Sequence, residues 1–271
     1  MKTRIIRYAC TAVAVAAAVI LLNTRQNPPE PSFEPRDYPQ IAESGILRAV
    51  TEYNAISYHV DKDTIRGFDY ELLNAFAKAK GLKLELTPEM SFNKRLQGIM
   101  KGQYDILGAE TAVTTAFKDS LLFTRTILLS KQVLVQRKPD ADSLYIRNQL
   151  ELAQKTLHVI KDSPALVRIH NLMSEIADTI YTEEVELYGE EQLMAMVAGK
   201  DIDYAVCDEN IAQATIEDYP NLDINTDIGF TQLYAWGVSK HSPILCDSLN
   251  HWLEAFLKSK EYHKLYKKYF K

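Results

Sequence analysis

Between residues 45 and 227, the apolar positions switch repeatedly between the period of a strand and the period of a helix. Residues 47–50 predict a strand. The helix predicted to follow carries four apolar residues on one face: Leu72, Leu73, Phe76 and Ala77. Asp69 lies where the N-cap of this helix is expected, and Gly81 lies just past its end, where a left-handed cap is expected. The alternation predicts an α/β fold with a mainly parallel sheet and helices on both faces.

The same alternation continues in the second half of the chain, where two extended runs, near residues 131–138 and 228–238, flank a complete α/β unit. We interpret these runs as hinge strands that join an inserted lobe to a first lobe. The predicted boundaries are residues 45–134 and 232–271 for lobe 1, and residues 135–231 for lobe 2. Such lobes close around a ligand, which binds at the carboxyl ends of the strands. A single open sheet with a helical tail is the alternative.

The N-terminus has the pattern of an export segment. Three basic residues, Lys2, Arg4 and Arg7, accompany an apolar run within residues 1–22. The run is short for a membrane span, so a cleaved signal peptide and an uncleaved signal anchor both remain open. Residues 23–44 contain five prolines among polar residues, which predicts a semi-extended tether and no folded element. The remainder is expected to be periplasmic, either free or anchored to the inner membrane.

Composition places the chain among ordinary globular proteins and removes several classes of function. Of its 271 residues, 46% are hydrophobic and 25% are charged, and the net charge of −5 argues against nucleic acid as a partner. There is no glycine-rich phosphate loop and no dinucleotide fingerprint in the sequence, and no cofactor is expected. Apart from Cys10 in the export segment, the cysteines are Cys207, predicted on a buried strand, and Cys246, predicted on a terminal helix.

Candidate catalytic groups do not form a constellation in the sequence. Five glutamates lie close together, and we interpret them as solvated loop and helix starts: Glu183, Glu184, Glu186, Glu190 and Glu191. Residues 59–63 have a metal-like spacing of histidine and aspartate, but a polar hairpin loop explains them better. The other histidines are scattered, and no serine lies in a nucleophile-elbow context. Binding without catalysis is therefore the better interpretation.

Two motifs point to a known family. They are Gly67-Phe68-Asp69-Tyr70-Glu71-Leu72-Leu73 and, about thirty residues later, Lys101-Gly102-Gln103-Tyr104-Asp105-Ile106. With the strand before them, they resemble the first lobe of the family 3 extracellular solute-binding proteins, the periplasmic amino-acid receptors of ABC importers. The resemblance extends from Gly45 to the terminus at Phe270. It implies a two-lobed periplasmic-binding-protein type II fold with two hinge strands, a small-molecule ligand between the lobes, and an ABC permease as partner.

The resemblance also implies a set of cleft residues. Residues 203–208 match the family strand whose last aspartate, here Asp208, receives the ligand's amino group. Residues 161–164 match the loop that opens the second-lobe helix, where free N–H groups and the charge of Lys161 would form an anion site. Two alternatives stay open: Ser163 only caps its own helix, and Phe92 is a core anchor. The expected ligand-binding residues are Glu52, Tyr58, Phe92, Glu110, Lys161, Ser163 and Asp208.

Other positions depart from the family pattern. The threonine and arginine that hold the ligand's α-carboxylate in the family correspond to Ala112 and Phe117, which cannot bind a carboxylate. Glu110 stands where the family usually has glycine, and with Glu52 and Asp208 it would make one end of the cleft acidic. We therefore expect a ligand with a cationic or amine group, such as a peptide or cell-wall fragment, in place of an ordinary α-amino acid.

A more specific resemblance is to the receptor-like domain of membrane-bound lytic transglycosylase F. It is carried by residues 203–208, residues 219–222, the strand with Trp236 and the final Lys-Tyr-Phe. In that family a catalytic module follows the receptor domain, and this sequence stops at Lys271, so we expect a stand-alone receptor or a fragment. Two hypotheses follow. Either an exported solute-binding protein captures an amino-acid-like, amine or peptide ligand for a transporter, or a regulatory module of peptidoglycan metabolism partners a peptidoglycan enzyme.

Overall fold

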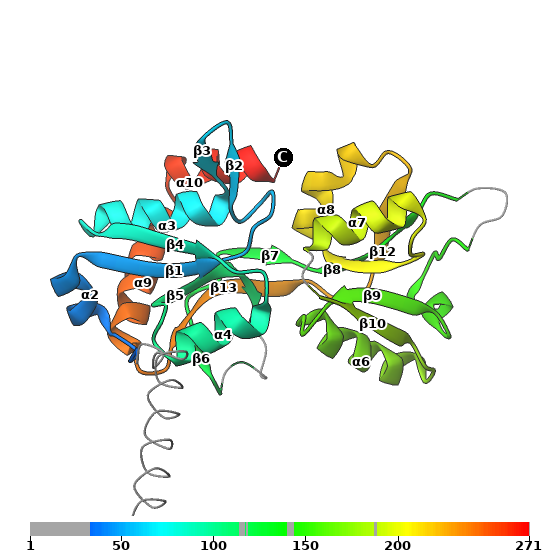
Figure 1. The fold of residues 1–271 in the computed structure, drawn as a ribbon, viewed down its shortest axis with the longest axis horizontal. Coiled ribbons are helices and arrows are strands. Elements are labelled where there is room, and N and C mark those ends of the chain that lie inside the picture. Colours follow the sequence, from blue (N-terminus) through cyan, green and yellow to red (C-terminus); the bar gives the residue numbers. More distant parts are fainter. Residues whose placement is uncertain (1–32, 114–116, 118, 140–143, 187–188, 271) are drawn as a thin grey trace, which may run out of the picture. The chain divides into compact units, whose positions relative to one another are not determined.

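The first sheet gathers strands from distant parts of the sequence. The computed structural model describes residues 33–270 except 114–116, 118, 140–143 and 187–188. The strand order is β4-β1-β5-β13-β6, and β7 also pairs with β13 (Figure 1). The bounds are β1 Ile46–Thr51, β4 Lys83–Pro88, β5 Ile106–Ala112, β6 Leu121–Phe123, β7 Leu128–Ser130 and β13 Gln232–Ser239. β1 is parallel to β4 and β5, whereas β13 runs antiparallel to β5, β6 and β7.

Helices cover both faces of this sheet. They are α2 Tyr38–Ser44, α3 Phe68–Ala79, α4 Phe92–Met100, α9 Pro243–Phe256 and α10 Lys260–Tyr269. One core cluster contains Phe68, Phe76 and Trp236, which are buried together with apolar residues of α9 and α10. A second cluster contains Ile99 of α4 and Leu107 of β5. Burial of these large side chains is the main force that holds the helices to the sheet.

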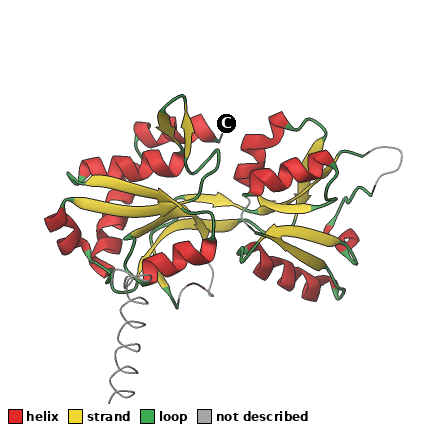
Figure 2. Cartoon of the chain, in the orientation of Figure 1, coloured by secondary structure: helices red, strands yellow, loops and turns green. Residues whose placement is uncertain are grey.

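The second sheet has the order β10-β9-β11-β8-β12. Its strands are β8 Gln132–Arg137, β9 Thr156–Ile160, β10 Tyr181–Val185, β11 Ala205–Asp208 and β12 Leu222–Asp227. Its helices are α6 Ala165–Ile176, α7 Glu190–Gly199 and α8 Glu209–Thr215, with the short 3-10 helices η1 Gln149–Leu152 and η2 Ile216–Asp218. Separate buried clusters lie under α6 and under α7 and α8. Helices therefore cover both faces of each sheet, as the strand–helix alternation predicts (Figure 2).

The chain passes between the sheets twice, from β7 to β8 and from β12 to β13 (Figure 1). β8 pairs with β11 and β12, so the whole of this strand belongs to the second sheet. The expected lobe boundary between residues 134 and 135 therefore falls inside β8. β13 lies wholly in the first sheet. The two crossings are short connections at Lys131 and at residues 228–231.

The predicted tether is wrong for its last residues, because Tyr38–Ser44 forms the helix α2. Asp37 and Gln40 make a capping box at its start, and Gly45 closes it in the left-handed conformation at φ 68°. The prolines misled the prediction, since Pro39 lies in the first turn, where a helix tolerates proline. Ile41 is fully buried against the first core cluster, and its burial ties the helix to the fold.

The start of α3 also differs from the prediction. Asp69 is not the N-cap: the helix begins at Phe68, and Gly67 is the N-cap with φ 135°. A Cβ atom at Gly67 would lie 2.3 Å from the carbonyl oxygen of Ser57, so only glycine fits. Gly81 follows the helix at φ 68°, which confirms the predicted left-handed position.

Several smaller predictions are confirmed. His59–Asp61 and Thr64–Arg66 form the predicted hairpin, β2–β3. Cys207 is buried in β11, Cys246 lies in α9, and both are free. The predicted export segment lies outside the described residues. Among the helices that are described, none combines the length and apolar character needed to cross a membrane.

Candidate ligand-binding cleft

A cavity of 340 Å³ lies where the two sheets meet, within the unit formed by residues 35–271. The ends of β1, β5, β9 and β11 contribute its walls, together with the starts of α4, α6 and α7 and residues of β8 and β13. The carboxyl ends of parallel strands are where open α/β sheets bind ligands, because no helix covers the sheet there. The position of the cavity therefore follows from the topology of both sheets.

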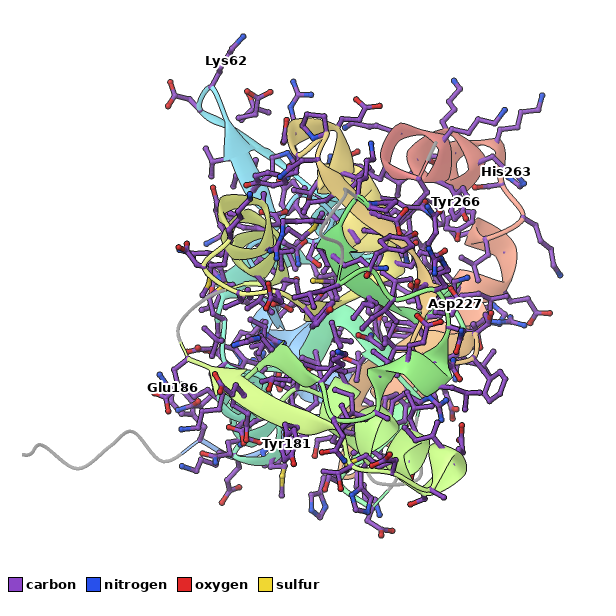
Figure 3. All side chains as sticks on the ribbon, turned by 90° about the vertical axis from the view of Figure 1, so that its right-hand side faces the viewer. Lys62, Tyr181, Glu186, Asp227, His263 and Tyr266 are labelled. Carbon is purple, nitrogen blue, oxygen red and sulfur yellow. The ribbon has the colours of Figure 1, made fainter. Side chains whose placement is uncertain are left out.

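The structure brings together four of the seven expected ligand-binding residues. Glu52, Phe92, Ser163 and Asp208 line the cavity, as does Ala112. Tyr58 lies outside the described lining, and its ring packs edge-on against Tyr53 and Tyr70. Lys161 also lies outside it and pairs with Glu186, which lies at the periphery of the molecule (Figure 3). The side chain of Glu110 is outside the described part of the structure.

Asp208 occupies the junction of a strand and a helix. It ends β11 and is the N-cap of α8, where its Oδ1 accepts hydrogen bonds from the backbone N–H of Asn210 at 2.9 Å and the hydroxyl of Ser130 at 2.7 Å. The residue is only 5% exposed. Oδ2 is buried and accepts no hydrogen bond of regular geometry from the described residues. The hydroxyl of Tyr234 also interacts with this carboxylate, so Asp208 is a buried anion at the cavity wall with no cationic partner among the described residues.

Glu190 lies beside Asp208 at the start of α7. Its Oε2 accepts the backbone N–H of Asp208 at 2.7 Å. Burial raises the pKa of Glu190 well above its usual range, and the carboxyl groups of Asp208 and Glu52 raise it further. Burial also raises the pKa of Asp208 to about 6, although interactions with the hydroxyls of Tyr234 and Ser130 lower it. Both carboxyl groups are therefore poorly solvated at this wall, and the charge of Asp208 disfavours ionisation of Glu190.

The guanidinium group of Arg95 forms hydrogen bonds with other residues on the first-sheet side of the cleft. Its Nη2 donates to Oε2 of Glu52 at 3.2 Å, and its Nη1 donates to the carbonyl oxygens of Glu89 and Met90 at 2.6 and 3.0 Å. It also lies 5.7 Å from the centre of the Phe92 ring. The charge of Arg95 is therefore balanced by Glu52, and one buried N–H, at Nε, has no partner among the described residues.

A second arginine, Arg168 of α6, lines the opposite side of the cavity. Its two Nη atoms make a bidentate contact with the carboxylate of Glu175 at 2.6 and 3.0 Å. Its Nε donates to the carbonyl oxygen of Ile228 at 2.9 Å, and the Phe230 ring covers the guanidinium group at 5.4 Å. The charge of this arginine is therefore also balanced by a carboxylate, and Nε, Nη1 and Nη2 each donate one hydrogen bond.

The start of α6 does not present the free N–H groups that the sequence suggested. The hydroxyl of Ser163 accepts the N–H of Ala165 at 3.2 Å, and the carbonyl oxygen of Ser163 accepts the N–H of Leu166 at 3.1 Å. The N–H of Val167 donates a hydrogen bond to the carbonyl oxygen of Pro164 at 3.2 Å. Ser163 thus satisfies donors in the first turn of α6 and also lines the cavity, so both its capping role and its contact with a ligand stay predictions.

Neutral polar groups complete the lining. The hydroxyl of Tyr234 accepts a hydrogen bond from Nε2 of Gln132 at 3.2 Å. Burial raises the pKa of Tyr234 well above its usual range, so the phenol stays protonated. Oε1 of Gln132 and Nδ2 of Asn54 are buried and have no partner among the described residues. Across the cleft, the N–H of Ala55 donates to Oε1 of Glu191 at 2.6 Å, which joins the loop after β1 to α7.

Sequence reasoning missed several lining residues, above all Arg95, Arg168, Glu190 and Tyr234. Glu190 was interpreted as part of a solvated acidic run, but it turns inward because α7 starts next to the end of β11. Arg95 was hidden within the apolar stripe of α4. The only signal available for either was its place at the first turns of a helix that follows a strand end.

The comparisons with known proteins agree with this geometry. Residues 47–271 match the family model described as bacterial extracellular solute-binding proteins, family 3. Membrane-bound lytic murein transglycosylase F of Desulfosudis oleivorans is 28% identical over 235 residues, which cover 85% of this chain and 50% of that protein. The protein of the same name from Photobacterium profundum is 27% identical, over 86% of this chain and 45% of its own length. The chain spans about half the length of the curated relatives it matches.

Solved structures give the same fold. A mutant of ArgBP from T. maritima superposes with a TM-score of 0.73 at 23% identity, over 86% of this chain and 98% of that one. The amino acid ABC transporter substrate-binding protein AbpA from Streptococcus pneumoniae, bound to L-arginine, has a TM-score of 0.72 at 22% identity, over 86% and 97%. At identities this low, structural similarity establishes the fold alone. The two superpositions confirm the predicted two-lobed α/β architecture.

Proposed function

The chain belongs to the bacterial extracellular solute-binding proteins of family 3, and we propose that it captures a small cationic solute in the cleft between its lobes. One observation carries the proposal: Asp208 and Glu190 present adjacent carboxyl groups to the cavity, and the two lining arginines are already paired with Glu52 and Glu175. A positively charged group would supply the missing counter-charge and a donor for Oδ2 of Asp208.

We propose lobe boundaries at the two sheet crossings, with residues 35–131 and 232–271 in lobe 1 and residues 132–231 in lobe 2. The pairing of β8 within the second sheet supports this division. A solute held between Glu52 on one side and Asp208 and Glu190 on the other would contact both lobes. Such a ligand favours closure because it binds the closed arrangement better than the open one.

The fold is that of a ligand-binding module, and we propose that the protein acts in the periplasm by binding and without catalysis. In this proposal the N-terminal segment directs export or anchors the module to the inner membrane, and an ABC permease receives the ligand. The name of AbpA, an amino acid ABC transporter substrate-binding protein, supports a transport role by analogy of fold only.

Calorimetric titration tests the proposal. The full chain, held in a mild non-ionic detergent, is titrated with basic solutes (arginine, lysine, agmatine, cadaverine) and with glutamine and glutamate as neutral and acidic controls. We expect micromolar binding of at least one basic solute, no binding of glutamate, and loss of binding in Asp208→Asn. Binding of glutamate, or binding of a basic solute that persists in Asp208→Asn, would remove the proposed site.

The second candidate function is a sensor or regulator of peptidoglycan metabolism. The observation in its favour is the similarity to proteins named membrane-bound lytic murein transglycosylase F, which the chain covers for about half of their length. In this proposal the ligand is a cell-wall fragment whose amine occupies the acidic wall, and the partner is a peptidoglycan enzyme. Titration with purified muropeptides distinguishes the two: tighter binding of a muropeptide than of any free basic solute favours the regulator.

A further inference from the structure

We infer that the preferred ligand carries its positive charge without a carboxylate group, and that it is an amine, diamine or guanidine in place of an amino acid. This inference rests on the proposed function, because it narrows the chemical class of the cation bound at Asp208 and Glu190. It follows from an inventory of the charged groups, the backbone donors and the apolar surfaces that line the cavity.

The charged groups of the lining are unbalanced in one direction. Three carboxyl groups, of Glu52, Glu190 and Asp208, face two guanidinium groups. Arg95 is paired with Glu52, and Arg168 is held by the carboxylate of Glu175 behind it. Among the described lining residues, Glu190 and Asp208 therefore have no cationic partner, whereas both arginines are paired with a carboxylate. A ligand carboxylate would enter a negative site and would lose its hydration without gaining a counter-ion.

A second and independent observation identifies the acidic wall as a binding point. Asp208 is 95% buried and lines the cavity, and its Oδ2 accepts no hydrogen bond of regular geometry from a described residue, although the hydroxyl of Tyr234 interacts with the carboxylate. Buried carboxylate oxygens are normally satisfied, and an ammonium or guanidinium N–H is the donor that suits this one. On the first-sheet side, the N–H of Arg95 at Nε is open, but it belongs to a guanidinium group whose charge Glu52 already balances.

The backbone donors at the start of α6 offer no place for a carboxylate. At the start of α6, Pro164 has no N–H, and the N–H groups of Ala165, Leu166 and Val167 are bonded within the turn. Ser163 also uses its own N–H, which donates to the carbonyl oxygen of Ile160 at 3.0 Å. The start of α6 is therefore closed to an anion, because its described N–H groups already have partners.

Part of the remaining wall is apolar, beside the neutral polar groups described above. Phe117 packs on Phe92 with a distance of 5.0 Å between ring centres, and Phe92 in turn lines the cavity. Further apolar lining comes from Met90, Ile160, Val167 and Ile211. Such a wall suits the methylene chain of an amine, because burial of methylene groups is favourable and their alignment needs no polar partner. This part of the wall offers a carboxylate no hydrogen-bond donor, since an aromatic face and methylene groups carry none.

Matched pairs of solutes that differ only by the carboxylate test the inference. The full chain is titrated by calorimetry with arginine against agmatine, lysine against cadaverine and ornithine against putrescine. We expect the decarboxylated member of the best-bound pair to bind about tenfold or more tightly than its parent. Equal or tighter binding of the parent amino acid, with binding still lost in Asp208→Asn, would overturn the inference and leave the proposed function intact. Absence of binding by every basic solute would instead remove the proposed function.

A substitution at the apolar wall provides a second readout. Phe117→Arg adds a guanidinium group next to Phe92, and we expect it to shift the ratio of agmatine to arginine affinity toward arginine. Leu150→Arg adds the same charge on η1, where the side chain is 70% exposed and outside the lining, and it should leave the ratio unchanged. An equal shift in both variants, or no shift in Phe117→Arg, would contradict the role of the apolar wall. The ratio measured on the unmodified chain stands even if Phe117→Arg fails to fold.

Discussion

Oε2 of Glu190 accepts a hydrogen bond from the backbone N–H of Asp208 at 2.7 Å, so the carboxyl groups of two helix-starting residues meet at one wall of the cavity. One of them ends a strand and caps α8, and the other begins α7. Each group is deprived of water, and the charge of Asp208 raises the pKa of Glu190. The wall therefore holds a proton up to a higher pH than an exposed carboxyl group does, and in our proposal a ligand cation takes the place of that proton.

The first prediction concerns the pH dependence of ligand binding. Burial raises the pKa of Asp208 to about 6, so this carboxyl group is neutral below that pH and ionised above it. A cation binds the ionised form, and we expect the affinity for agmatine to fall about tenfold per pH unit below pH 6. Calorimetry at several pH values in buffers of different ionisation enthalpy measures this together with the protons released. Affinity that is constant from pH 5 to 8 would contradict it.

The second prediction concerns stability. A pKa raised from 3.8 to about 6 means that the folded state loses up to about 3 kcal/mol as the pH rises through this window, because the unfolded state ionises first. Asp208→Asn removes this cost while its side-chain oxygen can still accept the bonds from Ser130 and Asn210. We expect the variant to be more stable than the unmodified chain at pH 7.5, with the difference vanishing near pH 3.5.

Chemical denaturation at both pH values measures that difference. A variant that is less stable than the unmodified chain at pH 7.5 would contradict the burial of an ionised carboxylate at this position. The same variant loses amine binding in the titrations above. The cavity therefore lowers the stability of the fold at neutral pH in order to keep an anion ready, which is a common arrangement at binding sites.

The sequence could predict those site residues whose position follows from a local pattern. It could not predict those whose position depends on tertiary packing. Asp208 could be found because it ends a short buried strand, and the carboxyl end of a strand has a fixed place in an α/β sheet. Glu190 could not, because its neighbour Glu191 has the same local pattern, and only the packing of α7 beside β11 decides how each points. Tyr58 was expected in the cleft, but its aromatic neighbours Tyr53 and Tyr70 hold it outside the described lining.

The third prediction separates Glu190 from the other acids of its run. Glu190→Gln keeps an oxygen to accept the N–H of Asp208 but removes one of the two charges at the wall, so we expect the affinity for agmatine to fall about tenfold. Glu217→Gln makes the same change on an exposed residue of η2 outside the lining. Calorimetry should show no effect of the control. Equal affinities for the two variants would show that Glu190 takes no part in binding.

The two sheets were more predictable from the sequence than the helix α2 at the start of the folded part. Strand and helix periods located both sheets, whereas α2 was missed because proline was counted as a breaker. Its stability comes from distant residues: Oδ1 of Asp37 accepts the N–H of Leu245 at 2.7 Å, and Oδ2 accepts the N–H of Ile244 at 3.1 Å. Arg36 similarly pairs with the buried carboxylate of Asp105. Contacts across more than sixty residues leave no local pattern in the sequence, so the analysis of a single window cannot find them.

The fourth prediction follows from the two helices that Asp37 caps. Its carboxylate accepts the N–H of Tyr38 in α2 and two N–H groups at the start of α9. Asp37→Ala leaves these donors unpaired, and we expect a loss of about 2 kcal/mol in the free energy of unfolding. Glu43→Ala on the exposed side of α2 is the matched control and should change stability little. Denaturant titration followed by circular dichroism compares them, and equal stabilities would assign residues 38–44 no anchoring role.

The fifth prediction addresses the contact across the cleft between Ala55 and Glu191. The N–H of Ala55 donates to Oε1 of Glu191 at 2.6 Å, so this bond can exist only while the loop after β1 lies against α7. Exchange of the Ala55 amide proton with solvent therefore reports opening of the cleft. In Glu191→Ala we expect this amide to exchange about tenfold faster, while amides of the β1 core strand keep their rates, since local opening needs no global unfolding. Agmatine should slow the exchange in the unmodified chain, because a bound ligand favours closure. If the Ala55 amide exchanges at the same rate with and without the Glu191 carboxylate, the contact does not control the opening of the cleft.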